Sequence, residues 1–195
     1  MGSHWSDHLR THLASTADVQ TRTAQACGGA IADSVRVIAA SLRTGGKLML
    51  CGNGGSAADC QHMAAELTCR LTRDFQRPGI AAMALTTDSS FLTAYANDVG
   101  FEGIFERQVQ ALGKPGDVLL AISTSGGSEN VRRAVQLARR TGILTVVLCG
   151  EGGPLEREAD VAIVIPSSVT AHVQEAMLPL EHVICHAVER ELFPD

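Results

Sequence analysis

Five short apolar runs, separated by stretches with helical character, set the pattern of this chain. Each run is largely apolar at consecutive positions and several are rich in β-branched residues, which is typical of strands covered on both faces of a sheet. The runs span residues 47–51, 80–85, 117–123, 145–150 and 161–165. The helical stretches among them span residues 56–70, 89–96, 103–112, 128–140 and 154–158. This alternation of strands and helices predicts a parallel sheet.

Further helical segments flank the alternating unit. Residues 5–27 and 30–42 precede the first predicted strand, and residues 171–192 follow the last. No repeat or low-complexity linker divides the chain. We therefore expect a single α/β domain over residues 1–195: a three-layer αβα sandwich with a five-stranded parallel sheet, extra N-terminal helices and a long C-terminal helix. The first four residues, MGSH, fit the remnant of an expression tag.

Charge and composition narrow the range of partners. The chain has 195 residues, 45% of them hydrophobic, and a formal net charge of −5 without any run of Lys or Arg. This charge pattern argues against binding of nucleic acid or of an anionic membrane surface. The apolar runs are far shorter than the roughly 20 residues of a membrane span, and the N-terminus lacks a signal-peptide core, so a cytoplasmic location is expected. The six cysteines show no CxxC spacing, which favours reduced core thiols over disulfides or a zinc cluster.

Two loops rich in Gly and Ser follow predicted strands. They are CGNGGS at residues 51–56 and STSGGS at residues 123–128. Ligands of open parallel sheets bind at the carboxyl ends of the strands, and glycine-rich backbone at a helix N-terminus favours an anion. Together the loops indicate a phosphate site. The alternative is a pair of tight turns in which Ser56 and Ser128 cap the following helices.

Nucleotide-binding motifs are a weaker interpretation of the same loops. The segment GNGGSA satisfies G-x-G-x-x-G/A, but no acidic residue closes the next strand about 20 residues on. Neither loop has the Gly-Lys-Ser/Thr of nucleotide hydrolases.

A possible metal site lies on two predicted helices. His62 and Glu66 are four residues apart and share one helical face, and Gln174 and His182, eight apart, roughly share another. Two imidazoles, a carboxylate and a weakly binding amide oxygen suit zinc or a similar divalent ion at a catalytic site. The alternative is an ordinary helical His–Glu contact and a polar stripe on a surface helix.

These motifs, in this order, resemble the sugar isomerase (SIS) domain family and, within it, the phosphoheptose isomerases. The resemblance covers nearly the whole chain and rests on CGNGGSAAD, QHMAAEL, ANDVGF, DVLLAISTSGGS and VQEA. It implies an aldose–ketose isomerase that converts sedoheptulose 7-phosphate to D-glycero-D-manno-heptose 7-phosphate through an enediol, the first step toward ADP- or GDP-heptose precursors. It also implies a cytoplasmic homotetramer with active sites between subunits and one zinc ion per subunit.

The resemblance assigns roles to residues by position. The implied metal ligands are His62, Glu66, Gln174 and His182. The implied substrate-binding residues are Asn53, Gly54, Gly55, Ser56, Glu66, Asn97, Asp98, Ser123, Thr124, Ser125, Ser128 and Gln174, with the hydroxyls of the second loop around the phosphate. Because enediol chemistry needs a base and an acid facing adjacent carbons, Glu66 is the candidate base and His182 the candidate acid. The alternative for Asn97 and Asp98 is an ordinary helix-ending turn.

The chain departs from the family pattern at three positions: Met177 replaces the usual histidine, Gly127 replaces an asparagine, and Pro179 lies inside the last helix. The proline is expected to kink that helix and to reorient His182, which makes His182 the least secure ligand.

Two other functions fit parts of the sequence. A non-catalytic adaptor resembling the replication-initiator-associating protein would share the C-terminal LFP, but that relative lacks a carboxylate at the position of Glu66. A phosphosugar-sensing domain would use the serine loop and would not need His62 together with Glu66. The isomerase is therefore the favoured hypothesis.

Overall fold

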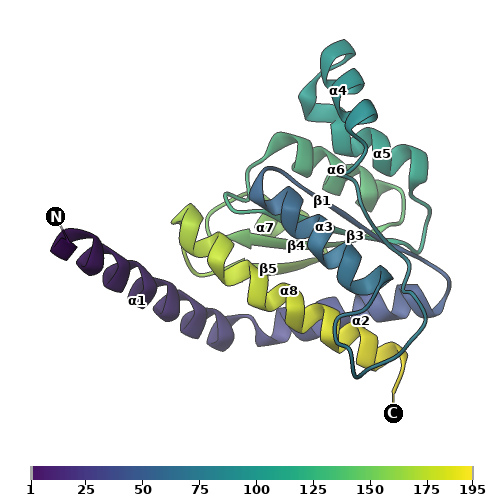
Figure 1. Cartoon of the computed structure of the whole chain (residues 1–195). Coiled ribbons are helices and arrows are strands. Elements are labelled where there is room, and N and C mark those ends of the chain that lie inside the picture. Colours follow the sequence, from purple (N-terminus) through teal and green to yellow (C-terminus); the bar gives the residue numbers. More distant parts are fainter. Residues whose placement is uncertain (1, 195) are drawn as a thin grey trace.

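A five-stranded parallel sheet forms the centre of the protein (Figure 1). The computed structural model describes the backbone of residues 2–194 and the side chains of residues 4–194. The strands are β1 (Leu48–Gly52), β2 (Ala82–Ala84), β3 (Val118–Ser123), β4 (Leu144–Gly150) and β5 (Val161–Ile165), in the order β2-β1-β3-β4-β5. All four pairings are parallel, so the predicted sheet is confirmed.

The helices of the described residues also match the predicted segments, with ends that differ by no more than three residues. They are α1 (Gly2–Ala26), α2 (Gly28–Arg43), α3 (Gly55–Thr68), α4 (Ser89–Asp98), α5 (Ile104–Leu112), α6 (Glu129–Arg140), α7 (Leu155–Glu158) and α8 (Thr170–Leu192), with a 3₁₀ turn η1 (Phe101–Gly103) before α5.

Alternating strand residues divide the core into two halves. Leu48 and Leu50 of β1 face the cluster formed with α2, α3 and α8, whereas Met49 and Cys51 face the cluster formed with α5 and α6. A strand buried on both faces needs apolar side chains at consecutive positions, which is the pattern seen in the sequence. The predicted three-layer αβα sandwich is therefore confirmed.

Cysteine burial agrees with the sequence prediction in most positions. All six cysteines are free, and five of them are buried, while Cys69 is exposed. Burial raises the pKa of Cys51 to about 12, so this thiol stays protonated and unreactive in the core.

The long helix α8 runs through Pro179 without interruption (Figure 1). Proline removes one helical hydrogen bond, but Met177, Leu180 and Ile184 on both sides of it are buried in the core, and their packing holds the two halves of the helix. His182 faces α3, where its Nε2 lies 2.8 Å from Nε2 of His62. Met177, at the position where the family has histidine, is fully buried.

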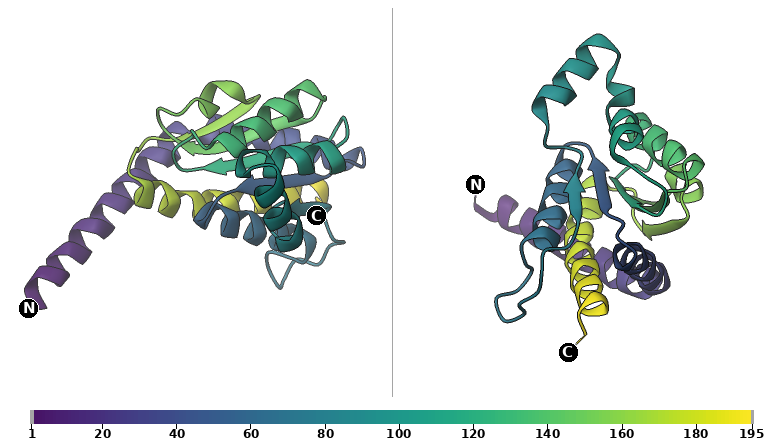
Figure 2. Two further views of the ribbon diagram at one scale, coloured as in Figure 1. Left: turned by 90° about the horizontal axis from the view of Figure 1, so that it is seen from above. Right: turned by 90° about the vertical axis from the view of Figure 1, so that its right-hand side faces the viewer.

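The first helix extends away from the rest of the protein. Figure 2 shows the N-terminal part of α1 projecting beyond the sheet, whereas its C-terminal part packs on the body through Val19 and Thr23. Trp5, Leu9 and Leu13 are exposed on this projection and recur every four residues, so they share one face. Within residues 2–194, no helix is both long enough and apolar enough to cross a membrane.

Candidate active site

The strand order brings the two Gly/Ser loops together. β1 and β3 are neighbours in the sheet, with Gly52 paired to Ile122, so the loops that follow these strands emerge side by side at the carboxyl edge. Gly54 has φ of 57° and ψ of −120°, a conformation that only glycine adopts at low cost. The backbone thus requires glycine at this position.

A reciprocal amide pair joins the first loop to the start of α6, directly after the second loop. The side-chain amide of Asn53 donates to Oδ1 of Asn130 at 2.9 Å, and that of Asn130 donates to Oδ1 of Asn53 at 2.9 Å. Asn130 lies in the first turn of α6 and is only 3% exposed. Asn130 was not expected from the sequence; its place as the second residue of the helix after the serine loop was the signal available.

The hydroxyls of Ser123 and Ser128 in the second loop contact each other, and Ser128 makes no helix-capping hydrogen bond. Oγ of Ser123 and Oγ of Ser128 are 3.1 Å apart, and Oγ of Ser125 accepts from the backbone N–H of Gly127 at 3.2 Å. Ser128 is the N-cap residue of α6, but its side chain makes no capping hydrogen bond, and α3 is capped by Gly54 rather than by Ser56. The capping alternative is therefore wrong for both serines. A Cβ at Gly127 would meet no atom closer than 3.8 Å, so a side chain fits here.

The facing surfaces of α3 and α8 bring His62, Glu66 and His182 together. Nε2 of His62 lies 2.8 Å from Nε2 of His182, and Nδ1 of His62 lies 3.8 Å from Oε1 of Glu66. The other oxygen of Glu66, Oε2, is buried and has no hydrogen-bond partner among the described residues. A buried carboxylate oxygen without a donor is costly, so the site has acceptor capacity left for a ligand.

Gln174 lies on the same side of α8 but nearer the first loop. Its amide nitrogen donates to Oδ2 of Asp59, and its oxygen accepts from Ser56 at 3.4 Å. A Cβ at Gly55 would lie 3.2 Å from that oxygen, so glycine leaves room for the amide. Three of the four expected ligands thus gather directly, and the contacts of Gln174 place it at the N-terminal turns of α3.

Asp59 is a second residue that was not expected from the sequence. Burial raises the pKa of Asp59, while the hydrogen bond from Gln174 and the charge of His62 act in the opposite direction. Its position three residues before His62, on the same helical face, was the signal that could have identified it.

Asn97 and Asp98 lie apart from these residues within this chain. They end α4, are exposed, and bond to each other, with Nδ2 of Asn97 donating to Oδ1 of Asp98 at 2.8 Å. Figure 1 shows α4 at the periphery, beyond α5 and distant from α8. Their expected contact with substrate stays a prediction.

Comparison with known proteins identifies the family. The sequence model for the SIS domain matches residues 11–150, which is most of the chain. The chain belongs to the SIS domain family.

Curated relatives of this SIS domain are named phosphoheptose isomerase. One from Akkermansia muciniphila is 43% identical over 96% of this chain and 98% of its own length. Another, from Rhodospirillum rubrum, is 47% identical over 95% of this chain and 98% of its own length. Among solved structures, the phosphoheptose isomerase of Francisella tularensis is 34% identical with a TM-score of 0.91, over 97% of this chain and all of that one.

Arg77 supports the part of this SIS domain that carries Glu66. Its guanidinium donates to the backbone oxygens of Glu66 at 2.8 Å and Leu67 at 2.7 Å, which are among the last carbonyls of α3. It also pairs with Glu189 of α8 at 3.0 Å, and both side chains are 1% exposed. The end of α3 is therefore fixed to α8 close to the expected base. Arg77 was not expected from the sequence, because it lies in the irregular segment between α3 and β2.

Proposed function

We propose that this SIS domain is a phosphoheptose isomerase, which interconverts sedoheptulose 7-phosphate and D-glycero-D-manno-heptose 7-phosphate. The observation that carries the proposal is the arrangement of Glu66 and His182 on either side of His62, in a chain 43% to 47% identical to proteins of that name. Sugar NMR on the purified protein with several ketose phosphates would test it. Turnover of none of them would overturn it.

Isomerisation moves a proton between two adjacent carbons and so needs a base and an acid on the same part of the substrate. Glu66 accepts the proton from carbon, and His182 exchanges protons with the sugar oxygens. His62 lies against both side chains and orients them. Such positioning converts binding energy into alignment of the reacting atoms.

Phosphate would bind at the second loop, where Ser123, Thr124, Ser125 and Ser128 offer hydroxyls beside the N-terminus of α6. Asn53, Gly54, Gly55 and Ser56 would line the sugar from the first loop. Because the Asn53–Asn130 pair ties the first loop to the start of α6, which follows the second loop, contacts within this chain set the distance between the phosphate and sugar subsites.

The donor set on α3 and α8 fits one zinc ion per subunit, held by His62, Glu66, Gln174 and His182. Two imidazoles already face each other, and Glu66 has an oxygen without a partner. When bound, zinc would polarise the substrate carbonyl and stabilise negative charge on the enediolate. The amide of Gln174 is the weakest donor of the four, so it is the one that would leave room for substrate.

We further propose a cytoplasmic homotetramer in which active sites lie between subunits. Trp5, Leu9 and Leu13 form an exposed apolar face on α1, which a second subunit would cover. Asn97 and Asp98, distant from His182 in their own chain, would then reach the site of a neighbour. Molar mass from light scattering tests the assembly, and a monomer at micromolar concentration would contradict it.

The adaptor and the sensing domain are less well supported than the isomerase. Glu66, which the adaptor lacks, is present and faces His62. The Vibrio vulnificus NanR protein complexed with ManNAc-6P has a similar fold, with a TM-score of 0.65, but only 20% identity, which bears on the fold alone.

Removal of the serine hydroxyls should weaken substrate binding. We expect Ser123→Ala with Ser125→Ala to raise KM by an amount equivalent to about 1–3 kcal/mol, because hydrogen bonds to a charged phosphate are lost. Ser168→Ala, in an exposed position after β5, serves as the control. An unchanged KM in the double variant would remove this loop from the phosphate site.

Chelation should abolish activity and leave the fold intact, because the sheet and its core do not depend on the zinc ligands. We expect activity to return on adding Zn²⁺, with the far-UV circular dichroism spectrum constant throughout. Full activity in protein shown by elemental analysis to hold no metal would reject the zinc proposal.

A further inference from the structure

A second group of metal-binding side chains lies where α1 packs on α8. His12 and Thr16 of α1 meet His172 and Glu175 of α8, and we name these four residues the α1–α8 cluster. Nε2 of His12 lies 2.6 Å from Oε1 of Glu175, and Nδ1 of His172 lies 3.3 Å from Oε2 of Glu175. Thr16 donates to Oε2 of Glu175 at 2.5 Å, and its oxygen lies 3.1 Å from Nδ1 of His172.

One potential ligand atom from each of His12, His172 and Glu175 lies within 4.8 Å of the other two. Two imidazoles and one carboxylate are a common ligand set for zinc and for other divalent transition metals. The cluster therefore offers one carboxylate and two imidazoles to a single ion.

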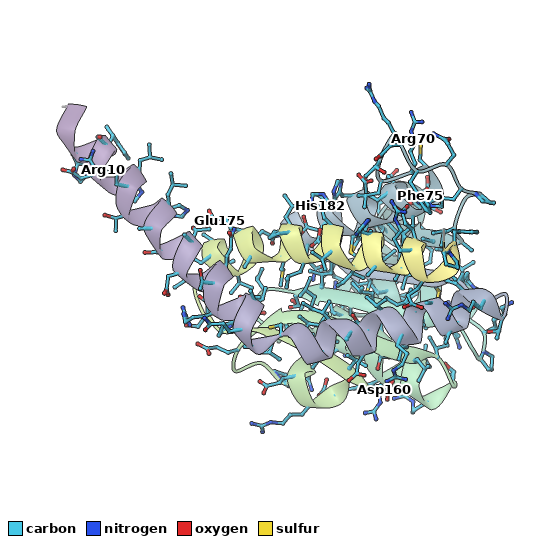
Figure 3. The ribbon with its side chains drawn as sticks, turned by 90° about the horizontal axis from the view of Figure 1, so that it is seen from below. Arg10, Arg70, Phe75, Asp160, Glu175 and His182 are labelled. Atoms are coloured by element: carbon cyan, nitrogen blue, oxygen red, sulfur yellow. The ribbon has the colours of Figure 1, made fainter. Side chains whose placement is uncertain are left out.

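We propose that His12, His172 and Glu175 bind one divalent transition-metal ion, at a site separate from the one formed by His62, Glu66, Gln174 and His182. Gln174 and Glu175 are adjacent in sequence but contact different helices: Gln174 bonds to Asp59 of α3, and Glu175 to His12 of α1. Figure 3 shows Glu175 beside α1 and His182 farther along α8. Occupancy of one site therefore does not require the other.

A modest adjustment converts the cluster from hydrogen bonding to metal binding. Ligands about 2.0–2.1 Å from a tetrahedral zinc ion lie about 3.3 Å apart, so the 2.6 Å contact between His12 and Glu175 must open by about 0.7 Å. To bind the ion, Nε2 of His12 must present its lone pair, so the single proton of the neutral ring then lies on Nδ1. The side chains of His12 and Glu175 are 33% and 38% exposed, which leaves them free to make this shift.

Access and a further ligand are available on the surface. His172 lines an open hollow with Asp18 and Arg22 of α1 and Ser167 of the preceding loop, which gives an ion a route to the cluster. His8 lies one helical turn before His12, with the two ring centroids 6.3 Å apart. A small rotation of His8 would bring a third imidazole toward the ion, and water would complete its coordination.

An ion at this position would tie the projecting α1 to α8. The cluster lies near the middle of α1, between the buried Val19 and the exposed Trp5. Metal binding should therefore reduce opening of the N-terminal half of α1 by coupling it to a helix packed in the core.

Cobalt titration of the chelator-stripped protein tests the proposal, because tetrahedral Co²⁺ has a visible spectrum and needs no enzyme activity. We expect two Co²⁺ ions per subunit in the parent, one in His12→Gln/His172→Gln, and one in His62→Gln/His182→Gln. If His12→Gln/His172→Gln binds as many ions as the parent, or if His62→Gln/His182→Gln binds none, the proposal is wrong. His62→Gln/His182→Gln leaves the α1–α8 cluster unchanged. It therefore tests the proposal even if His12→Gln/His172→Gln fails to fold.

Proteolysis provides a second readout, and His186→Gln the matched control. Arg10 is exposed on α1 before the cluster (Figure 3). We expect Co²⁺ to slow tryptic cleavage after Arg10 in the parent, in His186→Gln and in His62→Gln/His182→Gln, but not in His12→Gln/His172→Gln. Equal slowing in all four proteins would show that the ion acts elsewhere and would overturn the proposal.

Discussion

Replacing Glu66 with Gln is expected to lower kcat by about 100-fold to 10,000-fold, the usual effect of removing a general base. The amide keeps the size of the side chain and one oxygen that can bind a metal, but it cannot accept the proton from carbon. The substrate loops are untouched, so KM should change much less than kcat. Sugar NMR in deuterium oxide measures both turnover and the expected entry of solvent deuterium at C1 or C2 in the parent.

Glu156→Gln is the matched control, since Glu156 is an exposed carboxylate on α7. Its kcat should equal that of the parent. Heptose phosphate isomerisation by Glu66→Gln at the parental rate would show that another group is the base. A parent that never turns over these sugars but binds a protein partner would favour the adaptor.

Arg77→Met should lower the free energy of unfolding by about 3–5 kcal/mol, the range for removing one partner of a buried ion pair. The change leaves Glu189 buried without its cation, and it leaves the last carbonyls of α3 without a donor. Urea denaturation followed by circular dichroism measures the loss.

Two variants separate the causes of this loss. Arg36→Met removes an ion pair with Asp33 in which the side chains are 71% and 58% exposed, and it should cost less than about 1 kcal/mol. Arg77→Met/Glu189→Met removes both buried charges and should be more stable than Arg77→Met alone. If Arg77→Met is as stable as the parent, the Arg77–Glu189 pair contributes little to the free energy of unfolding.

The fold was predictable because the apolar runs that mark strands and the glycines that mark loops are both local features of the sequence. Consecutive apolar residues such as Leu48 to Cys51 specify a strand covered on both faces, and the loops between elements contain clear glycine signals. The order of the strands in the sheet cannot be predicted from such local features. It depends on which helices cover which face of the sheet, and residues from the whole chain determine that packing.

The proximity of His62 and Glu66 was predictable, because a spacing of four residues places both side chains on one helical face. The residues that were missed make contacts between elements: Asn130 of α6 bonds to Asn53 of the first loop, and Asp59 of α3 bonds to Gln174 of α8. Pro179 lies inside α8, which stays helical from Thr170 to Leu192 because buried residues on both sides of the proline pack in the core. Tertiary contacts decide all three cases.

The projecting first helix also carries the only tryptophan of the chain. Trp5 is 69% exposed in the single subunit, so its fluorescence there should have the long-wavelength maximum of an indole in water. Contact with a neighbouring subunit would replace that water with apolar side chains and shift the emission to shorter wavelength. Because the body of the protein contains no second indole, the emission spectrum on dilution would follow α1 alone. The chain thus contains an intrinsic optical reporter that separates loss of subunit contacts from unfolding of the sheet.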